Sequence, residues 1–167
     1  MACNKFIPCK EIPKDFALCV CRHDPDGSCQ KTRVSNYSPG PVADEEHLAR
    51  FVFYPTHIAD SDLCEALFSD AFTYGASCNR KSYCCDEGQI HACGMGLQHE
   101  RRVYRGYVTL SVSVLRGSGV RVYDTALEDN RCHADIVACP DIDKPKRKAI
   151  RIALLKHARE NGVVRYC

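Results

Sequence analysis

Cysteine is the residue type whose number and spacing most suggest chemistry, since 13 of the 167 residues are cysteines. Zinc in proteins is held by four thiolate or imidazole ligands that short loops bring together. The first group that could supply them comprises Cys3, Cys9, Cys19, Cys21, His23 and Cys29. A short segment without its own core gains folding energy from a metal. The group therefore predicts structural zinc, with disulfides or inert thiols as the alternatives.

A second group of zinc ligands falls in and after a glycine-rich stretch. It comprises Cys78, Cys84, Cys85, His91 and Cys93, and strand pairing could add Cys132, His133 and Cys139. Adjacent Cys84 and Cys85 point in different directions, so at most one of them suits a tetrahedral site. The alternative interpretation is that these cysteines are small buried side chains, because free cysteine packs well in cores.

Catalytic groups are harder to predict, because 13 cysteines and seven histidines make chance pairings frequent. His133 is the best single candidate. It begins a short apolar strand beside Asp135, where the end of a strand could present it to a cleft, although a structural histidine is the simpler interpretation. Arg50 on the first strand and Ser77 in the following loop are two further candidate polar groups.

Basic residues collect near the C-terminus. Residues 144–165 contain eight Lys and Arg residues, and only Glu160 opposes them. Lys146, Arg147, Lys148 and Arg151 could contact an acidic protein or the phosphates of a nucleic acid. A solvated helix face with basic residues near its C-terminal end is the alternative.

Overall charge and composition exclude several classes of protein. Apolar residues make up 45% and charged residues 26%, which is near the globular average, and the formal net charge is +2. We find neither an apolar leader nor a run of about 18 apolar residues that would suggest a membrane span. We therefore expect a cytoplasmic protein with mostly reduced thiols, and an odd number of cysteines cannot all pair within one chain.

Two parts of the chain differ in their patterns. Residues 1–43 are punctuated by prolines and turn signals, which predicts an irregular cysteine-rich arm. Residues 44–167 predict a compact domain. Strands are expected at 48–54, 103–115, 120–123 and 134–138, with 163–166 as an edge strand. The 103–115 and 120–123 strands should pair through the turn at 117–119.

Helices are expected in two places within that domain. A short helix should open at 60–62 after the first strand, since Asp62 and Glu65 have the form of a capping box. A longer basic helix should follow Pro145, with Asp143 or Lys144 as its cap, and end at 161–162. Residues 69–96 lack a clear period and are expected to be loop. The segment order favours an α+β fold with a mainly antiparallel sheet.

One resemblance covers residues 48–140. An Arg-bearing strand ends near a proline at 50–55, Ala71 and Phe72 follow in a polar loop, and a Gly-Tyr-Val-Thr-Leu strand at 106–110 precedes Asp124 and the run His-Ala-Asp-Ile at 133–136. This order resembles small uncharacterised bacterial α/β proteins. The resemblance implies a compact domain with His133 as a notable position, and it implies no activity.

These observations favour a soluble binding or accessory module with structural zinc, which contacts an acidic partner through its basic C-terminal helix. The first alternative is a small enzyme. Its most concrete version is an NAD-using transferase of the ADP-ribosyl type with His133, Arg50 and Ser77 in the site, which rests on analogy of fold. The second alternative is a secreted disulfide scaffold.

Overall fold

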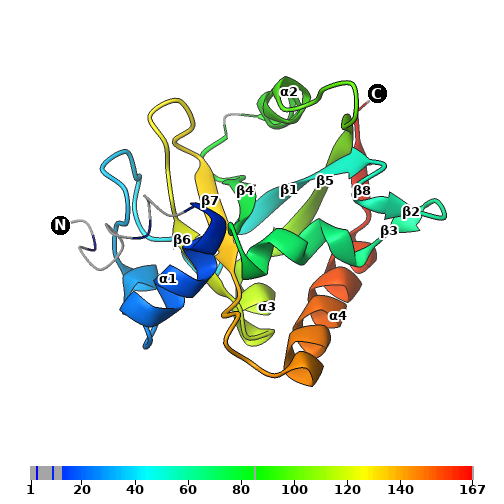
Figure 1. Cartoon of the computed structure of the whole chain (residues 1–167). Coiled ribbons are helices and arrows are strands. Elements are labelled where there is room, and N and C mark those ends of the chain that lie inside the picture. The colour runs from blue at the N-terminus through cyan, green and yellow to red at the C-terminus, as the bar shows by residue number, and fades with distance from the viewer. Residues whose placement is uncertain (1–2, 4–8, 10–12, 85, 167) are drawn as a thin grey trace.

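A six-stranded sheet forms the centre of the structure, which is a computed structural model (Figure 1). It describes residues 3, 9, 13–84 and 86–166. Every strand pair is antiparallel, and the spatial order is β6-β7-β4-β1-β5-β8. The strands are β1 His47–Tyr54, β4 Ala76–Arg80, β5 Val103–Ser111, β6 Arg121–Asp124, β7 His133–Val137 and β8 Val163–Arg165. A separate hairpin joins β2 Ile58–Ala59 to β3 Asp62–Leu63.

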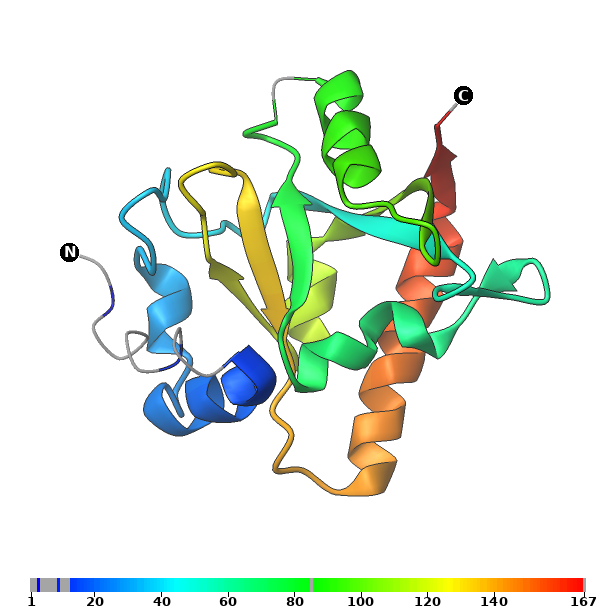
Figure 2. The ribbon, with the colours of Figure 1, turned by 45° about the horizontal axis from the view of Figure 1, so that its top comes forward.

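Helices lie on both faces of this sheet (Figure 2). The α-helices are α1 Phe16–His23, α2 Glu87–Gly96, α3 Val112–Gly117 and α4 Lys144–Asn161, and the 3-10 helices are η2 Pro13–Asp15, η3 Ser28–Lys31 and η4 Glu65–Phe72. The main core lies between one face and the helices α3, α4 and η4, and it includes Leu48, Leu110 and Leu154. The predicted α+β class with a mainly antiparallel sheet is confirmed.

The opposite face carries two smaller clusters. One joins α1 and η3 to Tyr123 and Val137 at the β6–β7 side of the sheet. The other joins Ile90 of α2 to Phe51 and its neighbours on β1 and β5. Because side chains alternate across a strand, this face has a strip of polar residues between the two clusters, and the candidate site lies there.

Several predicted elements have different bounds or partners. Residues 60–61 form the turn of the β2–β3 hairpin, so the expected helix begins later, at Glu65, and is a 3-10 helix. The expected strand 103–115 ends at Ser111, where α3 begins. Strand β6 pairs with β7 instead of β5. The expectations of a loop over 69–96 and of a wholly irregular arm are wrong, because β4 and α2 lie in the first and α1 in the second.

The C-terminal elements agree closely with the expectation. Helix α4 has Asp143 as its N-cap, whose side chain accepts a hydrogen bond from the Lys146 amide, and Gly162 follows the helix end. Strand β8 lies at the sheet edge beside β5. Gly106 makes this pairing possible, since it has φ +130° and a Cβ there would come within 2.1 Å of the Val164 carbonyl oxygen.

The buried ring of His57 is bonded to the end of β1, and its protonation state makes the stability of the fold depend on pH. Its ring is buried, and Nδ1 accepts a hydrogen bond from the Phe53 amide at 3.3 Å. Burial, together with the nearby charges of Arg50 and Arg102, lowers the His57 pKa to about 3. The ring is therefore neutral in the folded protein, whereas in the unfolded chain it titrates near 6.5.

We predict that this depressed pKa makes stability fall in mild acid. The contribution of His57 is complete above pH 6.5 and is lost as the pH falls towards 3, by about 2 kcal/mol at pH 5. The change in unfolding free energy between pH 7 and pH 5, measured with urea, should be smaller in His57→Asn than in the native protein. The matched control is His23→Asn, since His23 is exposed, and it should keep the native dependence. Equal slopes in all three proteins would contradict the prediction.

Candidate functional site

Polar side chains of β4 and β7 form the floor of the candidate site. In the antiparallel pairing of these strands Ser77 lies opposite Asp135, and Asn79 lies opposite His133. Residues directly opposite each other point to the same face, so all four side chains share the face between the two smaller clusters. Asp135 and Asn79 are buried, with exposures of 7% and 1%. Such an accumulation of buried polar groups needs hydrogen-bond partners.

Thr125 supplies most of these partners from the segment that follows β6. Its hydroxyl donates to Asp135 Oδ2 at 2.8 Å, and the Ser77 hydroxyl donates to Asp135 Oδ1 at 3.2 Å. His133 Nδ1 lies 2.9 Å from the Thr125 hydroxyl oxygen and 3.2 Å from the Thr125 carbonyl oxygen. The three side chains therefore form a chain in the order Asp135, Thr125, His133.

The protonation of the His133 ring follows from these contacts. Thr125 has one hydroxyl hydrogen and donates it to Asp135, so its oxygen can only accept a bond from His133. The Thr125 carbonyl oxygen can also only accept. Both neighbours thus require a hydrogen on Nδ1, which leaves the Nε2 lone pair open. No residue in the described part of the chain bonds Nε2, and the side chain is 15% exposed.

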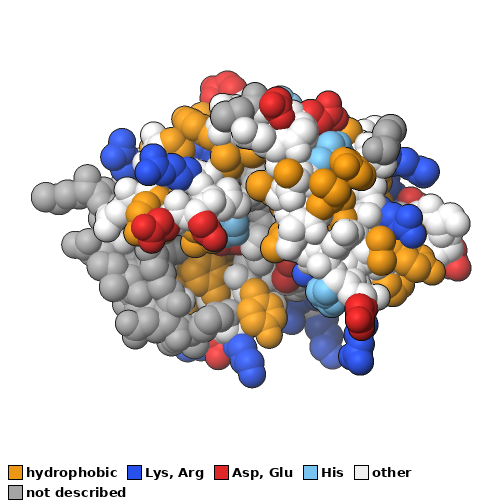
Figure 3. Space-filling model, turned by 90° about the horizontal axis from the view of Figure 1, so that it is seen from above, with side chains coloured by type: hydrophobic (Ala, Val, Ile, Leu, Met, Phe, Trp, Pro, Cys, Tyr) orange, Lys and Arg blue, Asp and Glu red, His pale blue; other side chains and the backbone are white. Residues whose placement is uncertain are grey.

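A pocket of about 360 Å³ lies above this floor. The N-terminal arm contributes one wall through Cys9, Phe16, Ser35 and Tyr37, and the remaining lining is Tyr74, Thr125, Ala126, Leu127, Glu128, His133 and Asp135. Figure 3 looks down on this side of the molecule and shows hydrophobic side chains within a hollow there. Concave, mostly apolar cavities with a few converging polar groups are typical of ligand sites.

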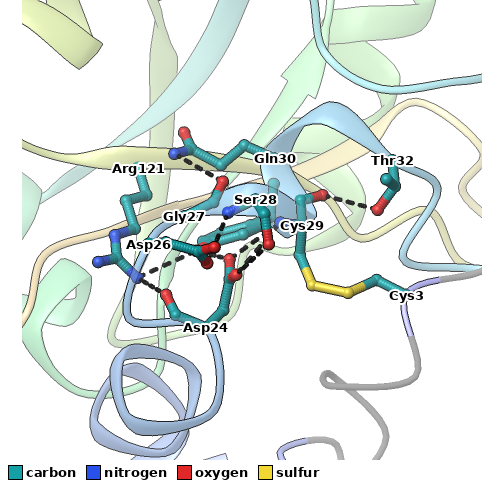
Figure 4. Close-up of a disulfide and its surroundings, with 10 residues drawn as sticks. Cys3, Asp24, Asp26, Gly27, Ser28, Cys29, Gln30, Thr32 and Arg121 are labelled. Atoms are coloured by element: carbon teal, nitrogen blue, oxygen red, sulfur yellow. Dashed lines mark hydrogen bonds between the residues drawn. A yellow bond between two sulfur atoms is a disulfide. The ribbon is translucent and has the colours of Figure 1, made fainter.

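A buried carboxylate fixes the arm against the sheet. Asp24 accepts hydrogen bonds from the Tyr123 hydroxyl at 2.9 Å and the Cys29 amide at 3.2 Å, while Arg121 donates to the Asp24 carbonyl oxygen (Figure 4). The same loop is closed by the Cys3–Cys29 disulfide. On the other side, the Ser35 hydroxyl donates to the Ala126 carbonyl oxygen at 2.5 Å. These contacts hold the arm wall of the pocket in place.

The first group of predicted zinc ligands is divided between disulfides and separate thiols. Cys3 pairs with Cys29, and Cys21 pairs with Cys139, which follows β7. Sulfur in a disulfide cannot act as a thiolate ligand. Cys9 and Cys19 are buried in one cluster, and His23 is exposed. In the part of the chain that the structure describes, no three His, Cys, Asp or Glu side chains are grouped so as to hold a metal.

The second group of predicted ligands is spread over both faces of the sheet. Cys78 lies in the main core, where burial raises its pKa to about 12. His91 is on the opposite side, on α2, and its Nδ1 lies 2.8 Å from the Tyr104 hydroxyl. Cys84 and Cys132 belong to the α2 cluster, and Cys93 is exposed. Cys85 lies outside the described residues. Zinc therefore stays a prediction that these contacts do not support.

The three predicted catalytic residues are not all brought together. His133 lines the pocket, and Ser77 lies on the same face of the sheet and bonds Asp135 without lining the pocket. Arg50 points to the opposite face. Its guanidinium donates to the carbonyl oxygens of Leu67 and Ser77 and pairs with Asp70 at 2.6 Å. Arg50 thus holds η4 against β4, and the sheet separates its side chain from His133.

The predicted partner-binding residues of α4 differ in their availability. Lys146 and Lys148 are exposed. Arg147 and Arg151 are half-buried with their guanidinium groups over the Phe72 ring, and Arg147 also donates to the Pro140 carbonyl oxygen. A partner contact at this helix would therefore depend mainly on the lysines, and it stays a prediction.

Sequence reasoning missed Thr125 and the aromatic walls of the pocket. Asp135 was noted only as a neighbour of His133, yet their spacing of two on a strand already places both side chains on one face. Thr125, Tyr37 and Tyr74 gave no such signal. They lie in segments between regular elements, and their positions depend on how the arm packs.

Comparisons with known proteins do not add to this assignment. The chain matches no protein-family model, no curated protein and no solved structure. Among the described helices, none is both long and apolar enough to cross a lipid bilayer.

We predict that the protein purified without reductant contains the Cys21–Cys139 and Cys3–Cys29 disulfides and no zinc bound to these four sulfurs. Native mass spectrometry should give a mass at least four hydrogens below that of the fully reduced chain. Peptide mapping under non-reducing conditions should link residue 21 to residue 139. A fully reduced chain that carries zinc would contradict both pairings and favour the metal instead.

We also predict that neutral His133 carries its hydrogen on Nδ1. In ¹⁵N NMR spectra of the neutral ring, Nδ1 should have the shift of a protonated nitrogen and Nε2 that of an unprotonated one. Thr125→Val keeps the side-chain shape but removes the hydroxyl between His133 and Asp135, so the tautomer preference should weaken. Nε2 protonation in the native protein would disprove the assignment.

Proposed function

We propose that the protein is a small enzyme in which His133 acts as a general base on a ligand held in the pocket. The observation that carries this proposal is the state of the imidazole. Nδ1 is fixed by Thr125, and Nε2 is left as an open acceptor on a side chain that lines the cavity. A histidine whose second nitrogen is oriented in this way suits proton transfer near neutral pH.

Asp135 supports the charged form of His133. Its Oδ2 lies 3.9 Å from His133 Nδ1 and is joined to it through the Thr125 hydroxyl. A carboxylate in a buried position stabilises an imidazolium that forms during proton abstraction, because the charge interaction is screened less than in water. In this arrangement Thr125 positions His133, Asp135 stabilises its charged form, and His133 is the residue that takes up the proton.

The pocket offers no activated nucleophile of its own among the described residues. The hydroxyl hydrogens of Ser77, Thr125 and Ser35 are each donated to another acceptor. Cys9 lines the pocket, but burial raises its pKa to about 12, so its thiolate is scarce. His133 would therefore remove a proton from the ligand itself or from a bound water molecule. This favours direct attack by a non-covalently bound group over a covalent enzyme intermediate.

The proposed enzyme differs from the transferase considered on sequence grounds. That version placed Arg50 beside His133, and Arg50 is instead committed to η4 and Asp70 on the other face. The present proposal uses only residues that share the pocket. It is independent of zinc and of the basic helix α4.

Hydrolysis of p-nitrophenyl acetate, a small activated ester, tests the proposed base. We expect a rate above the buffer background that falls about 100-fold in His133→Gln and by less in Thr125→Val. His23→Gln is the control for general reactivity of exposed imidazoles and should keep the native rate. If His133→Gln hydrolyses the ester as fast as the native protein, the proposed base is wrong.

A further inference from the structure

We infer that the pocket over His133 selects organic cations, namely a primary ammonium or guanidinium group attached to an apolar group. The inference concerns the pocket of the proposed function and rests on that function in no other respect. Three features of the lining carry it. They are the sign of its charges, the partners of Asp135 and the aromatic walls.

While His133 is neutral, all the charge in the described lining is of one sign. Its ionisable carboxylates are Glu128 and Asp135, and no described lysine or arginine lines the pocket. Two carboxylates in one small cavity repel an anionic ligand and attract a cationic one. The pocket thus disfavours phosphates and carboxylic acids.

Asp135 is the stronger of the two determinants because it is buried. Its hydrogen-bond partners are the neutral hydroxyls of Ser77 and Thr125. Within the described ranges, no lysine or arginine lies within ion-pair distance of it. Arg50 bonds the Ser77 carbonyl oxygen from the other face but is paired with Asp70. A buried carboxylate without a full counter-charge gains from a bound cation.

Aromatic side chains complete a cation site. Tyr37 and Tyr74 line the pocket and are 43% and 54% exposed, and Phe16 adds an apolar surface. Ring faces attract cations, and they also cover the flat or aliphatic part of an amine. The Tyr37 hydroxyl donates to Glu128 Oε2 at 3.2 Å, which holds this carboxylate beside the aromatic wall.

The volume limits the size of the cation. A cavity of about 360 Å³ is near the lower end of the range for ligand sites. It would hold a small amine or the side chain of one lysine or arginine. Inside, an ammonium nitrogen could donate to His133 Nε2. Transfer of that proton to Nε2 would leave a neutral amine with its lone pair and an imidazolium beside Asp135.

Matched ligands that differ in charge test the inference. Phenethylammonium and 3-phenylpropanoate share a phenyl ring and an ethylene linker, and Nα-acetylarginine amide represents a peptide side chain. We expect the cation to bind at least about tenfold more tightly than the carboxylate, measured by isothermal titration calorimetry at pH 7.5. Tighter binding of the arginine amide than of phenethylammonium would identify a peptide side chain as the source. Equal or tighter binding of 3-phenylpropanoate would overturn the inference.

Variants of the two carboxylates locate the binding. Asp135→Asn and Glu128→Gln should each weaken phenethylammonium binding about tenfold, whereas Glu100→Gln, an exposed carboxylate outside the pocket, should not. Glu128 is exposed, so its variant keeps the test valid if Asp135→Asn fails to fold. Native affinity in Glu128→Gln and in a folded Asp135→Asn would disprove the site.

The outcome can be separated from that of the proposed function. Ester hydrolysis that depends on His133 without cation selectivity would leave the base in place and remove the ligand class. Cation binding that persists in His133→Gln, in a protein without His133-dependent hydrolysis, would leave a binding pocket and remove the enzyme.

Discussion

In the antiparallel pairing of β4 with β7, Ser77 lies opposite Asp135 and Asn79 opposite His133, and the chemistry of the molecule depends on this register. A shift by one residue would turn Asp135 and His133 into the main core and bring Ala134 and Ile136 to the pocket face. The apolar residues Ala134 and Ile136 prevent such a shift because they are fully buried in the main core. The hydrophobic effect that builds the core therefore also fixes which polar groups meet in the pocket.

The same alternation separates two kinds of buried polar group. Arg50 and Arg80 have structural tasks. Arg50 holds η4, and Arg80 binds Glu46 at 2.6 Å and the carbonyl oxygen of Gly40, so it fixes the chain that enters β1. Their guanidinium groups are paired with carboxylates and carbonyl oxygens, which offsets the cost of burying charge. On the pocket face, the donors to Asp135 among the described residues are neutral hydroxyls, besides the neighbouring His133. This difference in pairing distinguishes the site from the framework.

The sequence predicts the elements that local interactions fix, and it does not predict those that depend on contacts between residues far apart in the chain. Helix α4 is predictable because the Asp143 cap, Pro145 and the spacing of Ile150 and Leu154 are local signals. Strand β1 is predictable because it is rich in aromatic and β-branched residues and ends before a proline. Helix α2 is not, since its packing on the sheet depends on Gly94, whose missing side chain leaves room for the Tyr104 ring. The Cys21–Cys139 pairing joins residues 118 positions apart, so no local spacing reports it. For the site, His133 was predictable from its position on a strand, whereas Ser77 was expected in a loop and lies on β4. The role of Thr125 requires the tertiary packing.

The hydrogen-bonded group of Asp135, Thr125 and His133 is better explained by a function than by a purely structural role. A purely structural position would be served by apolar side chains, as at neighbouring Val137 in the arm cluster, because replacing buried polar groups by apolar ones of similar shape is often neutral or stabilising. Instead, the chain places a carboxylate, a threonine and a histidine in contact beneath an open cavity, where they cost desolvation free energy. Polar groups that are retained at such a cost are typical of functional sites. The arm cysteines fit the same view, since the disulfides and Asp24 hold a wall that the pocket needs and that the short, proline-rich arm could not position by its own hydrophobic contacts.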